Sequence, residues 1–176
     1  MFHPDTQFLI DRWVDLARRP EVRGGLPARS QLRPEVLGSR LPRAFLLEGT
    51  GPDATFRLSG SWLEALQDRA LGGARFLDIW CASSPTLVVP ALAQAVREAR
   101  PIVIVAHGPQ ATPVEVTVAP LRGAEGRPGM FLGLIAPASA ARGVTGHAQR
   151  LAARLTVAVG DRGRPALCVV DDRRSA

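Results

Sequence analysis

The chain has 176 residues, a mass of 18.8 kDa and a formal net charge of +6, a length that suits one domain with short extensions. A hydrophobic fraction of 46% argues against a wholly disordered chain, and no apolar run is long enough to predict a membrane span. The N-terminus does not resemble a signal peptide, and the two cysteines, Cys81 and Cys168, are too few for a disulfide framework. We therefore expect a cytoplasmic protein.

The positive charge comes entirely from arginine and is concentrated near the C-terminus. All 22 basic residues are Arg, and Lys, Asn and Tyr are absent, which is typical of a GC-rich coding sequence. Residues 1–121 hold 13 Arg against 12 acidic residues, a net of +1, whereas residues 122–176 hold 9 Arg against 4, a net of +5. The body of the protein is thus nearly neutral, and its pI alone does not predict nucleic-acid binding.

An amphipathic helix is the first predicted element, beginning near Pro4. Leu9, Trp13 and Leu16 form an apolar stripe at helical spacing. The stripe needs a cover, which is either the chain's own sheet or a second copy of the chain. Residues 20–34 are rich in Gly, Pro and Arg and predict an irregular linker.

Two strands and a group of short helices follow. Residues 44–48 and 54–58 predict a β-hairpin, in which alternation would put Phe56 and Leu58 on one face and Arg57 on the other. Three helical segments are expected after the hairpin. They are residues 62–70, residues 75–80, and a longer helix from Ser84, as its N-cap, to Arg100.

Three further strands are expected at residues 102–106, 114–118 and 130–135, joined by Gly- and Pro-rich loops that suit antiparallel hairpins. Helices grouped between two sets of strands predict an antiparallel α+β domain. The sequence of the C-terminal segment is compatible with two interpretations. Residues 148–155 could form amphipathic helical turns, or residues 155–159 could pair with residues 167–170 as strands.

This element order, with Phe56-Arg57-Leu58-Ser59-Gly60, Leu71-Gly72-Gly73 and Trp80, resembles a bacterial, alphaproteobacterial-type family of single-domain PAS-like proteins. The resemblance implies a five-stranded antiparallel sheet with helices on one face and an N-terminal flanking helix. It divides the chain into an N-terminal helix and linker (1–34), a PAS-like domain (35–137) and an Arg-rich tail (138–176).

The resemblance also implies a sensory or regulatory module that acts in signalling through protein–protein interaction, with a small apolar ligand as a candidate regulator and no enzymatic activity. The alternative is a structural adaptor that binds no ligand. A ligand would lie between the helices and the inner sheet face, among bulky apolar residues that could equally form a fully packed core. These are Phe56, Leu58, Trp62, Leu66, Phe76, Ile79, Trp80, Leu92, Val96, Val116 and Leu132.

A homodimer is expected from the N-terminal stripe, because a symmetric interface would bury Leu9, Trp13 and Leu16 of both copies. Arg57, expected on the outer sheet face, is a further candidate for partner contact. Its alternative role is that of an ordinary solvated arginine.

Known PAS cofactors and metals find little support in the sequence. None of His3, His107 and His147 falls on the expected pocket helix, so a haem ligand is not predicted. Ala74 stands where a photoactive flavin domain would carry its Cys, no metal-ligand spacing recurs, and no Gly-x-Ser-x-Gly motif indicates a hydrolase. We leave the cofactor unknown, with haem and flavin disfavoured.

The basic tail suggests a third, weaker function, which is contact with nucleic acid or a membrane surface. Its arginines lack neighbouring aromatic residues, so base stacking is not expected. A solvated tail is the simpler interpretation. The arginines are Arg142, Arg150, Arg154, Arg162, Arg164, Arg173 and Arg174.

Overall fold

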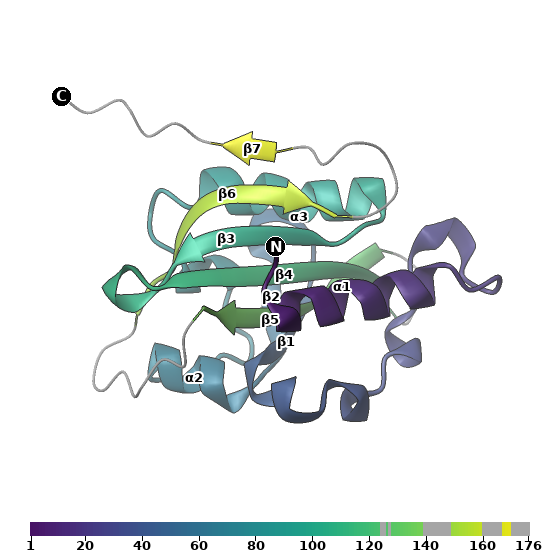
Figure 1. The fold of residues 1–176 in the computed structure, drawn as a ribbon, viewed down its shortest axis with the longest axis horizontal. Coiled ribbons are helices and arrows are strands. Elements are labelled where there is room, and N and C mark those ends of the chain that lie inside the picture. Colours follow the sequence, from purple (N-terminus) through teal and green to yellow (C-terminus); the bar gives the residue numbers. More distant parts are fainter. Residues whose placement is uncertain (124–125, 127, 139–148, 160–166, 170–176) are drawn as a thin grey trace.

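A computed structural model describes residues 1–123, 126, 128–138, 149–159 and 167–169. Its centre is one antiparallel sheet of seven strands in the order β2-β1-β5-β4-β3-β6-β7 (Figure 1). The strands are β1 (Ala44–Glu48), β2 (Thr55–Ser59), β3 (Ile102–His107), β4 (Pro113–Arg122), β5 (Pro128–Pro137), β6 (Ala152–Ala158) and β7 (Leu167–Val169). The five strands expected from the sequence are present, and two more extend the sheet beyond β3.

The two additional strands come from the C-terminal segment. β6 pairs antiparallel with β3 along its length, and β7 pairs with β6 through Leu155↔Val169 and Val157↔Leu167. The strand-pairing interpretation of this segment is therefore confirmed. The alternative of helical turns is wrong for residues 151–155, whereas Ala148 lies outside the described residues.

Helices cover both faces of the sheet. The inner face carries α2 (Ser61–Gln67), the short 3₁₀ helix η5 (Phe76–Ile79) and α3 (Pro85–Glu98), and the outer face carries α1 (Pro4–Ala17), which packs on β4 and β5 (Figure 1). The 3₁₀ helix η3 (Pro34–Arg43) precedes β1 and adds Leu37 to the outer layer. The remaining 3₁₀ turns are η1 (Arg23–Gly25), η2 (Arg29–Gln31), η4 (Gly51–Asp53) and η6 (Pro109–Ala111).

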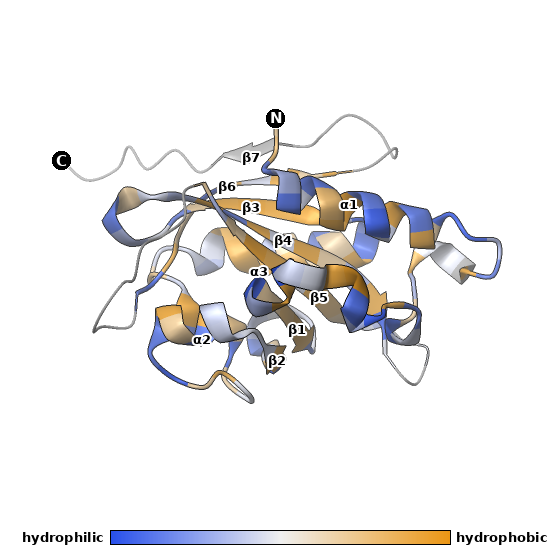
Figure 2. Cartoon of the chain, turned by 60° about the horizontal axis from the view of Figure 1, so that its bottom comes forward, coloured by the Kyte–Doolittle hydropathy of each residue, from blue (hydrophilic) through white to orange (hydrophobic). Residues whose placement is uncertain are grey.

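The N-terminal helix forms as its periodicity predicts. His3 is its N-cap, accepting a hydrogen bond from the Asp5 N–H at Nδ1, and Pro4 occupies the first helical position. One side of α1 is apolar and faces the sheet, while the opposite side is polar (Figure 2). This separation is what holds a surface helix against a sheet.

α3 is tied to the C-terminal segment rather than capped by its own N-terminal serine. Ser84 is the N-cap residue, but its side chain makes no cap hydrogen bond. Instead its hydroxyl accepts from the Ala153 N–H at 3.0 Å and lies 3.4 Å from the Leu151 carbonyl. Leu151 also pairs with the chain at Ile79 and Cys81 through backbone hydrogen bonds of 2.8 Å. Residues 149–158 therefore join the helical layer to the sheet edge.

Candidate functional site

Nine of the eleven candidate pocket residues do gather on the inner face of the sheet. Seven of them are buried members of one apolar cluster, and Trp62 and Val96 pack against it from partly exposed positions. The seven are Phe56, Leu66, Phe76, Ile79, Trp80, Leu92 and Val116. These nine residues therefore lie together in one apolar cluster on the inner face.

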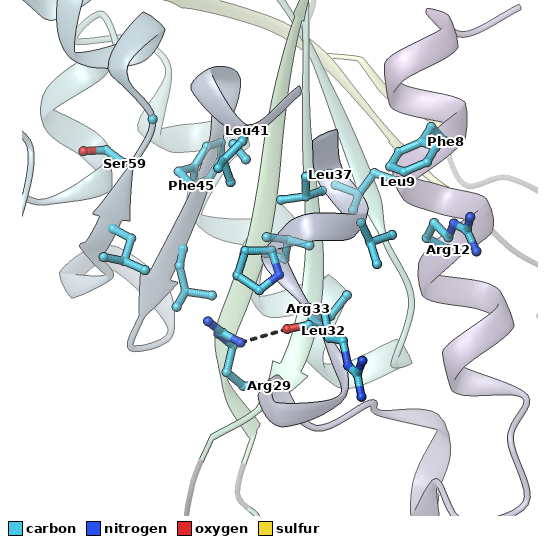
Figure 3. A pocket seen from close by; sticks show the side chains of 17 residues that line it. Phe8, Leu9, Arg12, Arg29, Leu32, Arg33, Leu37, Leu41, Phe45 and Ser59 are labelled. Atoms are coloured by element: carbon cyan, nitrogen blue, oxygen red, sulfur yellow. Dashed lines mark hydrogen bonds between the residues drawn. The ribbon is translucent and has the colours of Figure 1, made fainter. Parts of the chain in front are cut away.

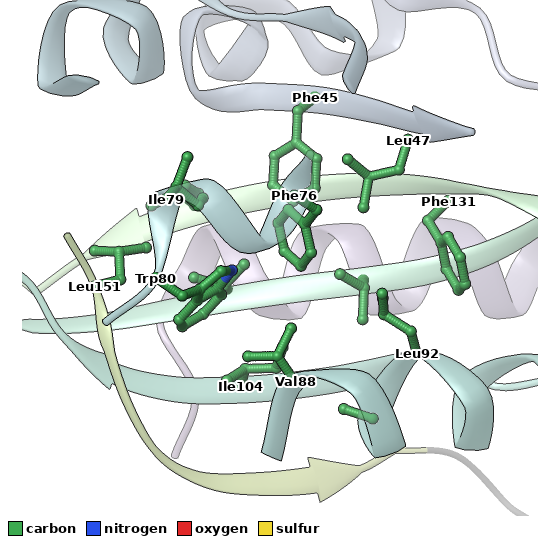
Figure 4. Packing of buried hydrophobic residues seen from close by; sticks show 14 of the residues in the cluster. Phe45, Leu47, Phe76, Ile79, Trp80, Val88, Leu92, Ile104, Phe131 and Leu151 are labelled. Atoms are coloured by element: carbon green, nitrogen blue, oxygen red, sulfur yellow. The ribbon is translucent and has the colours of Figure 1, made fainter. Parts of the chain in front are cut away.

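Aromatic rings fill the centre of this inner cluster (Figure 4). Phe76 lies 5.5 Å from Phe45, 5.7 Å from Phe56 and 5.6 Å from Trp80, measured between ring centroids. These are the offset and edge-to-face separations of well-packed aromatic pairs. Gly133 makes room for this arrangement, because a Cβ there would collide with the Phe45 ring. The inner cluster has the character of a packed core.

The expectation that Leu58 and Leu132 line this interior is wrong. Leu47 pairs with Phe56 but Leu46 pairs with Leu58, so Arg57 is an extra residue in β2 and forms a bulge. The bulge breaks the alternation of the strand and turns Leu58 away from Phe56, to the outer face. Leu132 lies opposite Leu46 on β5, and both belong to a second apolar cluster, which lies on the outer face.

The apolar stripe of α1 is covered by the chain's own sheet. Leu9, Trp13 and Leu16 are buried within a single chain, and the Trp13 indole Nε1 donates to the Pro120 carbonyl at 2.7 Å. These three residues are therefore not an exposed dimer surface. Arg57 is exposed, as expected, and pairs with the equally exposed Glu48 at 3.2 Å, a contact of small energetic weight.

A groove of about 290 Å³ opens on the outer face between α1 and η3 (Figure 3). We call it the outer groove. Its floor comes from β1, β2 and β5, its walls come from α1 and η3, and the segment after η2 closes one end. It is lined by Phe8, Leu9, Arg12, Arg29, Leu32, Arg33, Pro34, Val36, Leu37, Leu41, Ala44, Phe45, Leu46, Leu58, Ser59, Gly60 and Leu132.

The outer groove carries the unusual exposed apolar surface of the protein. Val36, Leu41 and Leu58 are 44%, 48% and 59% exposed, and all three line it. Apart from Met1, they are the large hydrophobic side chains that stand open to solvent in the described part of the chain. Single exposed leucines are common, but a cluster of them around a hollow marks an interaction site.

A buried carboxylate joins the two walls of the outer groove. Asp5, near the start of α1, accepts from Arg40 Nε at 2.7 Å and lies 2.8 Å from Arg43 Nη2. Both arginines belong to η3, and the Arg40 guanidinium also lies over the Phe8 ring, 4.1 Å from its centroid. We call this cluster the Asp5 clamp, because it fixes the separation of α1 and η3.

The charges that line the outer groove are all positive. Arg12, Arg29 and Arg33 line it without an acidic residue among the lining side chains. Arg29 is oriented by its Nη1, which donates to the Leu32 carbonyl at 3.0 Å (Figure 3). Arg12 lies 5.7 Å from the Phe8 ring centroid. This arrangement can receive an anion beside an apolar surface.

A second, more polar depression adjoins the outer groove and shares Arg29, Leu46 and Leu58 with it. We call it the arginine depression. It adds Arg57 and Arg122, and its lining contains one acidic residue, Glu21. The described residues that line the two adjoining hollows thus include five arginines, of which Arg57 is paired with Glu48, and one acidic residue, Glu21.

The end of β2 is fixed beside the outer groove by a carboxylate. Glu64 of α2 accepts at Oε1 from the Ser59 hydroxyl at 2.6 Å and from the Leu71 N–H at 3.2 Å. The Ser59 hydrogen bond, followed by that from Leu71, holds the pKa of Glu64 below its ordinary value. Gly60 completes the turn, since a Cβ there would overlap the Pro42 carbonyl.

No sequence pattern pointed directly to the outer groove. Arg12 lies on the polar side of α1, and the other lining arginines and exposed leucines lie in irregular segments and near a strand end, positions that are typical of ordinary surface residues. Of the lining residues, the sequence singled out Ser59 and Gly60 as part of the family motif, and Leu9, Leu58 and Leu132 for other roles. The signal that could have found the groove was Val36 and Leu41, two large apolar residues in a polar, proline-containing segment.

The two described histidines make structural contacts. His3 caps α1, and the His107 Nδ1 accepts from Arg154 Nε at 3.3 Å. Among the described residues, no three His, Cys, Asp or Glu side chains come together as a metal site requires.

Two of the tail arginines lie in the part of the chain that the structure describes, and both are exposed: Arg150 precedes β6, and Arg154 lies near the start of that strand. The other five and His147 lie outside the described residues. In the part of the chain that the structure covers, no helix has the length and apolarity to cross a membrane.

Comparison with known proteins decides the family. A sequence model described as a PAS domain matches residues 1–136, which include every element from α1 to nearly the end of β5. The chain belongs to the PAS domain family. Membership makes it a sensory or regulatory module. The PAS match ends before β6 and β7, so these strands extend the sheet beyond the matched domain.

No curated protein matches this PAS chain. Among solved structures, one described as "Flavin Analogue Sheds Light on Light-Oxygen-Voltage Domain Mechanism" is similar at 15% identity and a TM-score of 0.47. The similarity covers 60% of this chain and 84% of that one.

Proposed function

We propose that this PAS domain acts in signalling by binding a protein partner, with no catalytic step of its own. The observation that carries the proposal is the construction of its outer layer. α1 and η3 lie over the outer sheet face, are joined by the Asp5 clamp, and leave Val36, Leu41 and Leu58 exposed beside it. Surfaces of this kind serve as interaction sites.

A change in the arrangement of α1 and η3 over the sheet is the proposed signal. A partner or ligand can shift such an arrangement only if it binds the two states with different affinity. The Asp5 clamp is the contact through which both elements would respond together. The resemblance to bacterial single-domain proteins supports a module that acts on separate partners, and the free thiol of Cys81 suits the cytoplasmic setting that we propose.

Partner capture with matched variants tests this function. The tagged full-length chain, its Asp5→Asn variant and an Asp15→Asn control would be compared by cross-linking in the native host. Asp15 is exposed on the same helix. We expect a protein that the wild-type chain and the control retain equally and that Asp5→Asn retains at a different level. Identical sets on all three forms would contradict the proposal.

A second copy of the chain is one candidate partner. Static light scattering at tens of micromolar reports whether the chain forms the proposed homodimer. A dimer would have to use a surface other than Leu9, Trp13 and Leu16, since the chain's own sheet covers them. A strict monomer would remove self-association from the proposed function and leave other partners.

The two versions of the proposal, a module regulated by a small ligand and a structural adaptor that binds no ligand, can be distinguished by experiment. Native mass spectrometry of the purified chain, compared with its denatured mass, shows whether a molecule is retained. A small apolar ligand on the inner face would have to displace the packed rings around Phe76. We therefore expect a ligand to bind on the outer face.

A further inference from the structure

We propose that the outer groove and the arginine depression together bind a single-chain amphiphile with an anionic head group, either a carboxylate or a phosphate. The apolar chain lies in the outer groove, between α1 and η3. The head group lies among the arginines where the two hollows meet. This inference deepens the proposed function by naming a ligand class, and its effect on signalling rests on that function, whereas binding itself does not.

The apolar part of the site is built for a narrow, flexible chain. The outer groove has a volume of about 290 Å³, close to the lower limit of about 300 Å³ for small-molecule sites. Leu41 and Leu58 stand half exposed at its opening and Leu46 and Leu132 are buried at its floor. An alkyl chain lying across the floor would remove the exposed leucines from water, which is favourable in proportion to the apolar area covered.

The charged part of the site lies away from the apolar end. Arg29 and Arg33 stand at one end of the outer groove, apart from Leu41 and Phe45 (Figure 3). Arg33 is exposed and makes no ion pair with any residue that the structure describes. Arginine binds carboxylate and phosphate oxygens through paired N–H donors. The separation of apolar and cationic ends is the pattern of an amphiphile.

The arginine depression strengthens the case for an anion. It shares Arg29 with the outer groove and adds Arg122 and Arg57, of which Arg57 is already paired with Glu48, while Glu21 is the one acidic residue among its described lining residues. Such an excess of one charge raises the local concentration of anions and steers them to the site. It also disfavours a second copy of the chain in the same place, because a symmetric contact would bring the same arginines together.

Binding in the outer groove would act on the elements that the signalling proposal requires to move. The chain of the ligand would contact lining residues of both elements, among them Leu9 of α1 and Leu37 of η3, while its head group would contact the segment that begins at Arg29. A ligand seated between two walls favours the arrangement in which both are in place. Occupation of the outer groove would thus change both the arrangement of α1 and η3 and the apolar surface that a partner can contact.

Calorimetric titration of the full chain tests the proposal. The probes are octanoate, decanoate and dodecanoate, decyl phosphate as the alternative head group, and decanol as the uncharged control, all below their micelle concentrations. We expect saturable binding of one molecule per chain, with decanol at least about tenfold weaker than the better of decanoate and decyl phosphate. The better head group distinguishes a carboxylate from a phosphate ligand.

Three variants locate the site, and all change exposed side chains, so the fold should persist. Arg33→Gln should weaken the anionic probes about two- to fivefold without affecting decanol. Leu41→Gln should weaken all probes about three- to tenfold, because an amide replaces apolar contact. Arg69→Gln, at an exposed arginine beyond α2, is the matched control and should change nothing.

The proposal is overturned by any of four results. These are no saturable binding of an anionic probe, binding that Arg33→Gln and Leu41→Gln leave unchanged, an affinity for decanol equal to that for the better of decanoate and decyl phosphate, or NMR shift changes confined to inner-face residues such as Val88 and Leu92. Each result concerns binding alone. The Asp5→Asn capture experiment could still show an altered partner and so support the signalling proposal. The failure of one proposal is therefore distinguishable from the failure of the other.

Discussion

The two faces of the sheet are built from similar residues but in opposite ways. On the inner face, Phe45, Phe56, Phe76 and Trp80 pack ring against ring and are almost fully buried. On the outer face, leucines around the outer groove remain half exposed beside arginines. The inner face therefore supplies stability, whereas the outer face has surface left over for binding. A PAS domain can keep these tasks apart because a sheet presents alternate residues to its two sides.

Truncating one side chain on each face tests this contrast most directly. Phe76→Ala should destabilise the protein by about 4 kcal/mol, because the ring is fully buried and its removal leaves a cavity. Leu58→Ala, at a residue that is 59% exposed, should cost no more than about 0.5 kcal/mol. Chemical denaturation measures both. Similar losses for the two variants would show that the faces do not differ in the way described.

Glycine substitution tests how tightly the inner face is packed. In Gly133→Ala the new methyl group would collide with the Phe45 ring, so we expect a loss of about 3 kcal/mol in the free energy of unfolding. Gly72→Ala is the matched control, since nothing lies within 4 Å of a Cβ at that position, and it should be nearly neutral. If thermal melting finds the two variants equal, the inner face has more free space than the ring packing indicates.

Removing the charge of the Asp5 clamp tests what holds the outer layer. Asp5→Asn leaves Arg40 and Arg43 without their shared carboxylate, and we expect a loss of about 2 kcal/mol. Amide hydrogen exchange should quicken in α1 and much less in α3, because α1 takes part in the clamp and α3 does not. Asp15→Asn should leave both helices unchanged. Equal acceleration in α1 and α3 would mean that the outer layer does not move independently.

The smallest expected effect concerns the titration of Glu64. Ser59→Ala removes the hydrogen bond that contributes most to lowering the Glu64 pKa, so this pKa should rise toward its ordinary value. Because the folded-state pKa of Glu64 lies below the unfolded value, its contribution to stability is present above the unfolded pKa and is lost as pH falls through the folded pKa. NMR titration of the Glu64 carboxyl carbon measures the change. Ser61→Ala, at an exposed neighbour, should not shift it.

Much of the fold was predictable because local patterns and packing agree. The stripe of Leu9, Trp13 and Leu16 predicted α1, and alternation predicted β4 around Val116. The family motif around Gly60 also has a structural reason, since no side chain fits against the Pro42 carbonyl. Local periodicity suffices where one face of an element is buried along its whole length.

The predicted site was wrong at Leu58 because one residue changed the phase of a strand, and wrong at Leu132 because both faces of β5 are apolar there. The bulge at Arg57 places Leu58 on the face opposite Phe56, and no feature of the sequence distinguishes this strand from one that alternates throughout. The outer groove was missed for a related reason. Its walls come from segments far apart in sequence, and nothing in Arg33 or Leu41 indicates that α1 lies nearby.

The sequence by itself determined the order of the elements as far as β5, the family and most of the apolar residues that are hidden. Only the tertiary structure decided which side of the sheet each of them faces, that α1 covers its own sheet, and that β6 and β7 join the edge beside β3. The physical reason is that periodicity and turn chemistry act over a few residues. Strand register, a bulge and the pairing of a distant edge depend on contacts between segments that the sequence does not place together.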